Sequence, residues 1–157
     1  MTVALLFLPA YLCEYVRAMY CDFSDEGAVR FPPSSDIAQL LISAMCRRRH
    51  SGDSVPPDYV TLPVALPTNG GKRAETFCCL SADGQRRIVH RLRSMMWAEL
   101  HSWLDDCLHR RGWTLQESVR MFCLRWGITT LSEGALLKNY YRWRQRVRAF
   151  KVDGLPL

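Results

Sequence analysis

Arg, Lys, Asn and Gln side chains near the C-terminus have the types and the spacing to bind an anion. We expect residues 133–150 to form a helix, and at about 100° per residue these polar side chains gather on one side of it. A face with planar, bidentate donors suits phosphates and guanine edges. The side chains expected at the groove or backbone of a nucleic acid are Lys138, Asn139, Arg142, Gln145 and Arg146, and those expected to hold phosphates are Arg144 and Arg148.

The opposite side of this expected helix is apolar. A stripe of five side chains recurs there at helical spacing, and such a stripe is typical of a helix that packs on a protein core. An Arg-rich face can also be merely solvated or can bind another protein, and both alternatives stay open at this point. The stripe consists of Leu136, Tyr140, Trp143, Val147 and Phe150.

Capping signals precede this helix and the helix before it. Thr114 is followed three residues later by Glu117, and Thr130 is followed by Glu133, so each pair can form a capping box. Gly127 can end the first helix in the left-handed conformation. Two helix starts separated by a helix-length segment and a glycine favour a helix–turn–helix, which is typical of nucleic-acid binding.

A long helix is expected before this pair, from a cap at Ser81 to about Arg110. Its apolar face would support the two C-terminal helices. Its first turns carry four arginines, whose positive charge opposes the helix dipole unless an anion or an acidic neighbour compensates. The four are Arg86, Arg87, Arg91 and Arg93.

The first part of the chain combines helical segments with short β-leaning runs. Val3–Leu8 suits a buried strand. Tyr59–Leu66 and Thr76–Leu80 flank a segment with two glycines and predict a hairpin, in which Pro63 would place its strand at a sheet edge. The expected fold class is mainly α with a small β element, and with a C-terminal helix–turn–helix-like unit packed on a long helix.

The segment 50–58, HSGDSVPPD, is the expected internal boundary or mobile loop. Residues 1–58 would then form an N-terminal α region with a short strand. Residues 59–157 would form the β-hairpin followed by a three-helix unit. At this length the two regions are expected to share one compact domain.

Charge is distributed unevenly along the 157 residues. Residues 86–151 hold 14 Lys or Arg and 5 Asp or Glu, whereas the remainder holds 7 and 10. This asymmetry favours an anionic partner for the C-terminal half. With 48% hydrophobic residues and five Trp, the chain has ample material for a core, which excludes global disorder.

The sequence lacks the motifs of the common enzymes and metal sites. No H-E-x-x-H, G-x-S-x-G or zinc-deaminase pattern occurs, so no catalytic residue, metal site or cofactor is expected. The seven cysteines have neither disulfide-framework nor zinc-module spacing, which favours the reducing cytoplasm. No apolar run is long enough for a membrane span, so no membrane partner is expected.

The segments TLQESVRMFCLRWGI and SEGALLKNYYRWRQRVR resemble small proteins encoded by bacterial prophages and mobile elements. They are also similar in outline to the C-terminal helix–turn–helix of Mor-type phage activators, over about residues 86–150. The resemblance implies a DNA-binding role in transcription regulation. The chain departs from the motif at Glu133, where an apolar residue is usual. A turn lengthened by two or three residues would bring Ala135 or Leu136 to that place.

Together these features predict a nucleic-acid-binding protein that uses the basic helix at 133–150, with duplex DNA favoured over RNA. The alternative is a protein-interaction adaptor, such as a small phage factor that binds an acidic partner protein. An enzyme is not expected. The sequence leaves the oligomeric state and the target open.

Overall fold

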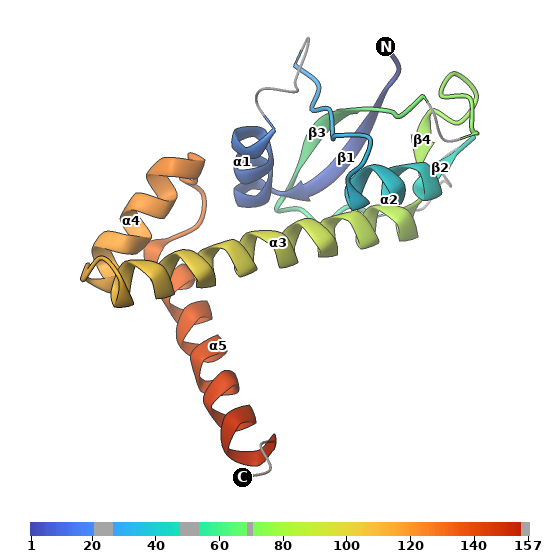
Figure 1. Cartoon of the computed structure of the whole chain (residues 1–157). Helices are drawn as coiled ribbons and strands as arrows, with labels where there is room; N and C mark the ends of the chain where they lie inside the picture. The colour runs from blue at the N-terminus through green and yellow to red at the C-terminus, as the bar shows by residue number, and fades with distance from the viewer. Residues whose placement is uncertain (21–26, 48–53, 69–70, 155–157) are drawn as a thin grey trace. The chain divides into compact units, whose positions relative to one another are not determined.

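The structure is a computed structural model that describes residues 1–20, 27–47, 54–68 and 71–154, with side chains up to residue 151. The first residues of the expected boundary segment 50–58 lie outside these ranges. Five helices and two small antiparallel sheets make up the described part, so the fold is mainly α as expected (Figure 1). The chain divides into two compact units, Met1–Met95 and Met96–Leu157. This division falls inside a helix.

The larger sheet of the first unit pairs the N-terminal strand β1 (Val3–Pro9) with β3 (Tyr59–Ala65) in antiparallel register. Alternate residues of the two strands are buried, as the period of a strand requires. Leu6 lies opposite Leu62 on the buried face. Helix α1 (Ala10–Met19) packs against both strands and buries its Leu12, Tyr15 and Val16 side chains.

The expected hairpin between Tyr59–Leu66 and Thr76–Leu80 is wrong, because each run pairs with an earlier strand. The short strand β4 (Cys79–Leu80) pairs with β2 (Met45–Cys46), directly after α2 (Asp36–Ala44). Lys72 explains this placement, because its Nζ donates to the carbonyls of Ile42 at 3.0 Å and Met45 at 2.9 Å. These bonds tie Lys72 to the end of α2, next to β2.

Pro63 lies at the outer edge of β3, as expected from its missing N–H. Its carbonyl accepts from Val29 N at 2.9 Å, on the side of β3 away from β1. The ring therefore removes no hydrogen bond from the ladder between β1 and β3.

Helix α3 (Ala82–His109) begins at the expected cap, since Ser81 Oγ accepts from Gly84 N at 3.1 Å. Its first turn lies against α2, where a Cβ added at Gly84 would stand 2.3 Å from Ala44 Cβ. Three of the four arginines in its early turns have acidic neighbours, and the fourth donates to two tyrosine hydroxyls. Arg86 and Arg87 pair with Asp83, Arg91 pairs with Asp36, and Arg93 donates to Tyr11 and Tyr59.

The second unit holds the end of α3 together with α4 (Leu115–Trp126) and α5 (Glu133–Gly154). The first capping box is confirmed, with Thr114 Oγ1 accepting from Glu117 N at 3.2 Å and Glu117 Oε2 accepting from Thr114 N at 3.1 Å. Gly127 ends α4 with a φ of 63°, in the left-handed region that favours glycine.

The second capping box is wrong, because α5 starts after Ser132 and not after Thr130. Ser132 Oγ accepts from Ala135 N at 3.1 Å, and Glu133 instead pairs with Arg120. The turn between α4 and α5 thus runs from Gly127 to Ser132 and is longer than the usual three or four residues. Leu136 lies in the core, whereas Glu133 is exposed.

The core of the second unit forms where the three helices meet. Phe122 of α4 and Leu136 of α5 are fully buried, as is Leu104 of α3. Trp103 Nε1 donates to the carbonyl of Ser118 at 2.9 Å and fixes α4 on α3. Across the described part of the chain, no helix has the length and apolarity to cross a membrane.

Candidate nucleic-acid interface

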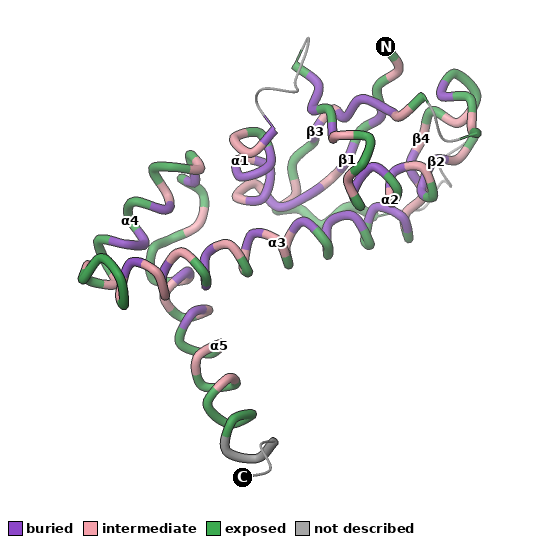
Figure 2. The backbone as a smooth tube through the Cα atoms, viewed as in Figure 1, coloured by how far each residue is buried: buried purple, intermediate pink, exposed green. Residues whose placement is uncertain are grey.

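The apolar stripe of α5 is covered only along its first half. Leu136 and Tyr140 are buried, and Trp143 and Val147 are partly buried. Phe150 is 74% exposed, so the expectation that the whole stripe packs in the core is wrong at its end (Figure 2). Figure 1 shows the second half of α5 extending away from α3 and α4, and no side chain described there is buried.

The His101 side chain of α3 contacts two residues of α5. The ring of Trp143 stacks on His101, with the ring centroids 4.4 Å apart and the planes 12° from parallel. Burial lowers the pKa of His101, so the ring is neutral near pH 7, and its Nε2 lies 2.7 Å from Asn139 Oδ1. A proton on Nε2 makes this contact a hydrogen bond from the histidine to the amide oxygen.

One turn further along α3, Asp105 holds two more residues of α5. Tyr140 donates its hydroxyl proton to Asp105 Oδ1 at 2.7 Å, and Arg144 Nη1 lies 3.8 Å from the same oxygen. Burial and then the bond to Asp105 raise the pKa of Tyr140 to about 12. These contacts fix the rotation of α5 about its axis and thereby decide which side chains face outward.

Two of the seven expected site residues therefore lie on the α3 side. Asn139 is bound to His101, and Arg144 is partly buried beside Asp105. Their polar groups hold the helix in place. The other five are exposed, and we refer to them together as the basic stripe: Lys138, Arg142, Gln145, Arg146 and Arg148.

No carboxylate neutralises the cations of the basic stripe within the described residues. The sequence explains this, because no Asp or Glu occurs between Gly134 and Lys151. Other arginines of the second unit differ, since Arg110 pairs with Asp106 and Arg120 with Glu133. The stripe runs from Lys138 to Arg148, and the ten steps between these residues correspond to about 15 Å of helix.

Tyr141 borders the basic stripe and was not among the expected site residues. Its side chain is 53% exposed and lines a cavity of about 400 Å³ with Gln145 and Arg148. An exposed aromatic ring beside arginines can stack on a nucleic-acid base. The sequence could have predicted this exposure. Tyr141 directly follows the buried Tyr140, so the rotation of the helix turns its side chain away from the core.

Comparison with known protein families, with curated proteins and with solved structures finds no match to this chain. The resemblance of residues 86–150 to prophage-encoded helix–turn–helix proteins stays a prediction. The function of the basic stripe must therefore be argued from its own charge and exposure. No cluster of three or more potential metal-ligating side chains occurs among the residues that the structure describes.

Proposed function

We propose that the chain binds nucleic acid, with duplex DNA as the ligand, through the basic stripe of α5. The observation that carries this proposal is the set of four exposed cations, Lys138, Arg142, Arg146 and Arg148, without a carboxylate partner among the described residues. Like charges within about 15 Å repel one another, and an anion with closely spaced charges relieves that repulsion. The phosphates of a duplex are such an array.

The architecture of the second unit supports the same proposal. An α-helix with its side chains is about 10–12 Å wide and fits the major groove. The second half of α5 presents exposed side chains around most of its circumference, so a duplex has access to the basic stripe. The stripe contains no carboxylate, thiol or imidazole, which favours binding over catalysis.

A salt titration tests the proposal directly. The full chain is titrated with a labelled mixed-sequence duplex and followed by fluorescence anisotropy at several salt concentrations. If the four cations contact phosphates, the logarithm of the affinity should fall with the logarithm of the salt concentration with a slope of about −3.6. Absence of duplex binding at low salt would refute the proposal, and a clear preference for single-stranded RNA would refute the choice of DNA.

A matched pair of double variants separates a specific face from general basicity. Arg142→Gln with Arg146→Gln removes two cations of the basic stripe and should make the salt slope shallower by about two. Arg110→Gln with Arg120→Gln removes the same charge from cations that already have carboxylate partners. The second pair should leave the slope unchanged within about half a unit. Equal effects of the two pairs would contradict the assignment of the basic stripe.

A second candidate function is binding of an acidic protein, and the exposed end of α5 favours it. Val147 and Phe150 line a shallow cavity of about 510 Å³ together with Arg146 and Lys151. Cations beside exposed apolar side chains suit an acidic partner that also carries apolar residues. Phe150→Ser distinguishes the two functions, because it leaves phosphate contacts intact and should change duplex affinity by less than about twofold.

A further inference from the structure

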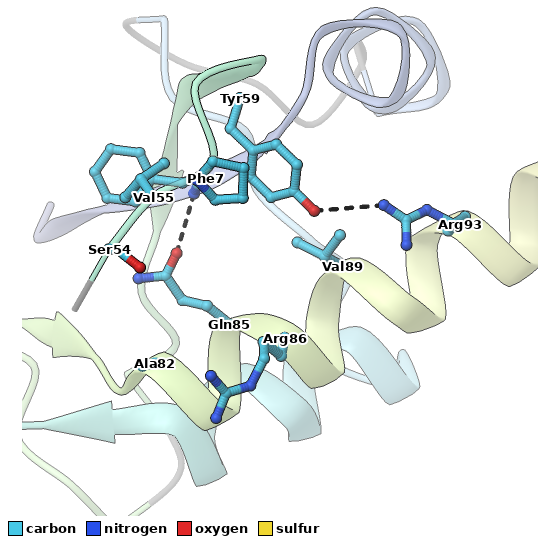
Figure 3. A pocket seen from close by; sticks show the side chains of 10 residues that line it. Phe7, Ser54, Val55, Tyr59, Ala82, Gln85, Arg86, Val89 and Arg93 are labelled. Atoms are coloured by element: carbon cyan, nitrogen blue, oxygen red, sulfur yellow. Dashed lines mark hydrogen bonds between the residues drawn. The ribbon is translucent and has the colours of Figure 1, made fainter.

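A cavity of about 590 Å³ opens in the first unit, between β1, the start of β3 and the N-terminal half of α3 (Figure 3). Its volume lies within the range of small-molecule sites. All of its lining residues belong to Met1–Met95, and none of them is acidic. Its walls combine apolar side chains with polar ones, chiefly Phe7, Val55, Tyr59, Gln85, Val89 and Arg93.

Gln85 presents a hydrogen-bond donor to this cavity. The residue is only 7% exposed, and its Oε1 accepts from the backbone N of Phe7 at 3.1 Å. Because an N–H group needs an acceptor, this bond fixes the orientation of the amide and identifies Nε2 as the opposite atom. Among the described residues Nε2 has no hydrogen-bond partner, so its two protons are left for a ligand in the cavity.

Arg93 supplies the positive charge at the other end. Its Nε donates to Tyr11 Oη at 3.3 Å and its Nη2 to Tyr59 Oη at 3.5 Å. Both partners are neutral phenols, and no carboxylate among the described residues pairs with this guanidinium. Among the described residues Nη1 has no hydrogen-bond partner, so its two N–H groups can donate to a ligand. Figure 3 shows the side chain extending to the Tyr59 hydroxyl.

The spacing of the polar groups sets the length of the ligand. Gln85 and Arg93 lie two turns apart on α3, about 12 Å along the helix axis. Val89 lies midway between them and contributes an apolar wall with Phe7. Arg86 also lines the cavity, but it pairs with Asp83, so Arg93 is the guanidinium of the lining that has no carboxylate partner among the described residues. One such guanidinium matches a single negative charge, whereas phosphate sites usually gather several cations or backbone N–H groups.

We propose that this cavity binds a small organic carboxylate. The carboxylate accepts from Arg93 and Tyr59, an apolar body lies against Phe7 and Val89, and a hydrogen-bond acceptor near the far end meets Gln85 Nε2. The site is independent of the basic stripe, so either proposal can fail without the other.

Calorimetric titration of the full chain with benzamidohexanoate tests the site, because this probe carries a carboxylate, an apolar chain and an amide carbonyl. Saturable binding is expected with a dissociation constant at or below about 1 mM. The methyl ester of the probe keeps the body without the charge and should bind at least tenfold more weakly. Benzamidohexyl phosphate should also bind more weakly than the carboxylate.

Variants locate the probe. Arg93→Met should weaken binding at least tenfold, whereas Arg91→Met removes the same charge outside the cavity and should stay within about twofold. Gln85→Glu keeps an oxygen for Phe7 N but removes the donor, so it should also weaken binding. Arg93→Lys keeps the charge and should bind more tightly than Arg93→Met, which separates loss of charge from loss of fold.

Several outcomes would overturn this inference. They are equal binding of the carboxylate and its ester, tighter binding of the phosphate, parental affinity of folded Arg93→Met, and absence of carboxylate binding to the folded parent at about 1 mM.

Discussion

The contact between Tyr140 and Asp105 allows a test of how firmly α5 is fixed on α3. Tyr140→Phe removes a hydroxyl that donates to a carboxylate at 2.7 Å and leaves the ring in place. Hydrogen bonds to charged groups contribute about 1.5–3 kcal/mol, so the free energy of unfolding should fall by about that amount at pH 8. Tyr141→Phe is the matched control, because its exposed hydroxyl should contribute under about 0.5 kcal/mol at the same pH.

The pH dependence of this difference follows from the raised pKa of Tyr140. The pKa is about 12 in the folded state against 10.0 for an unperturbed tyrosine, so the folded state holds its proton more tightly. The stabilisation is complete below pH 10 and is lost as the pH rises from 10 through 12. Two pKa units correspond to roughly 2.7 kcal/mol in full, of which about half is lost by pH 11.

Urea unfolding followed by tryptophan fluorescence measures this effect. The parent and Tyr140→Phe are compared at pH 8 and at pH 11, where other titrating groups contribute equally to both proteins. The difference in unfolding free energy should shrink by about 1.4 kcal/mol at the higher pH. A difference that is the same at both values would refute the anchoring of α5 by Asp105.

Three further substitutions test other contacts. Trp143→Ala removes a partly buried ring that stacks on His101, and thermal or urea unfolding should show a loss of about 2–4 kcal/mol; an unchanged stability would mean that the ring is exposed. Gly84→Ala should destabilise the first unit by about 1–3 kcal/mol in the same assay, because the new methyl would meet Ala44. Ser132→Ala should lower helix content at the start of α5 and cost about 1 kcal/mol, and a neutral effect would contradict its role as the cap.

Local signals predicted the helices well. The caps at Ser81 and Thr114 and the glycine at 127 act within three or four residues, so the sequence alone reveals them. Strand pairing was harder, because β1 and β3 are separated by 49 residues that include two helices. A sequence gives the alternation of a strand but not its partner, and a nearby run is then the natural but wrong choice.

The candidate site could be predicted as a helix face but not residue by residue. Helical periodicity separates two sides of α5, yet Asn139 and Arg144 stand at the border between them. Whether they face α3 or solvent depends on the residues of α3 beside them, namely the ring of His101 and the carboxylate of Asp105. These two partners lie 38 and 39 residues away in the sequence, and no local pattern indicates them.

The same argument separates the two ends of the apolar stripe. Periodicity treats Leu136 and Phe150 alike, because both fall on the same side of the helix. In the structure the first is fully buried and the second is 74% exposed, because α5 extends beyond the helices on which its first half packs. At this end of the helix, the apolar surface of Phe150 is exposed to water, which is unfavourable. The neighbouring cations also repel one another because no carboxylate neutralises them. The end of α5 therefore has a stronger physical reason to contact a partner than any other part of the helix, and the proposed DNA and acidic-protein ligands would satisfy different parts of it.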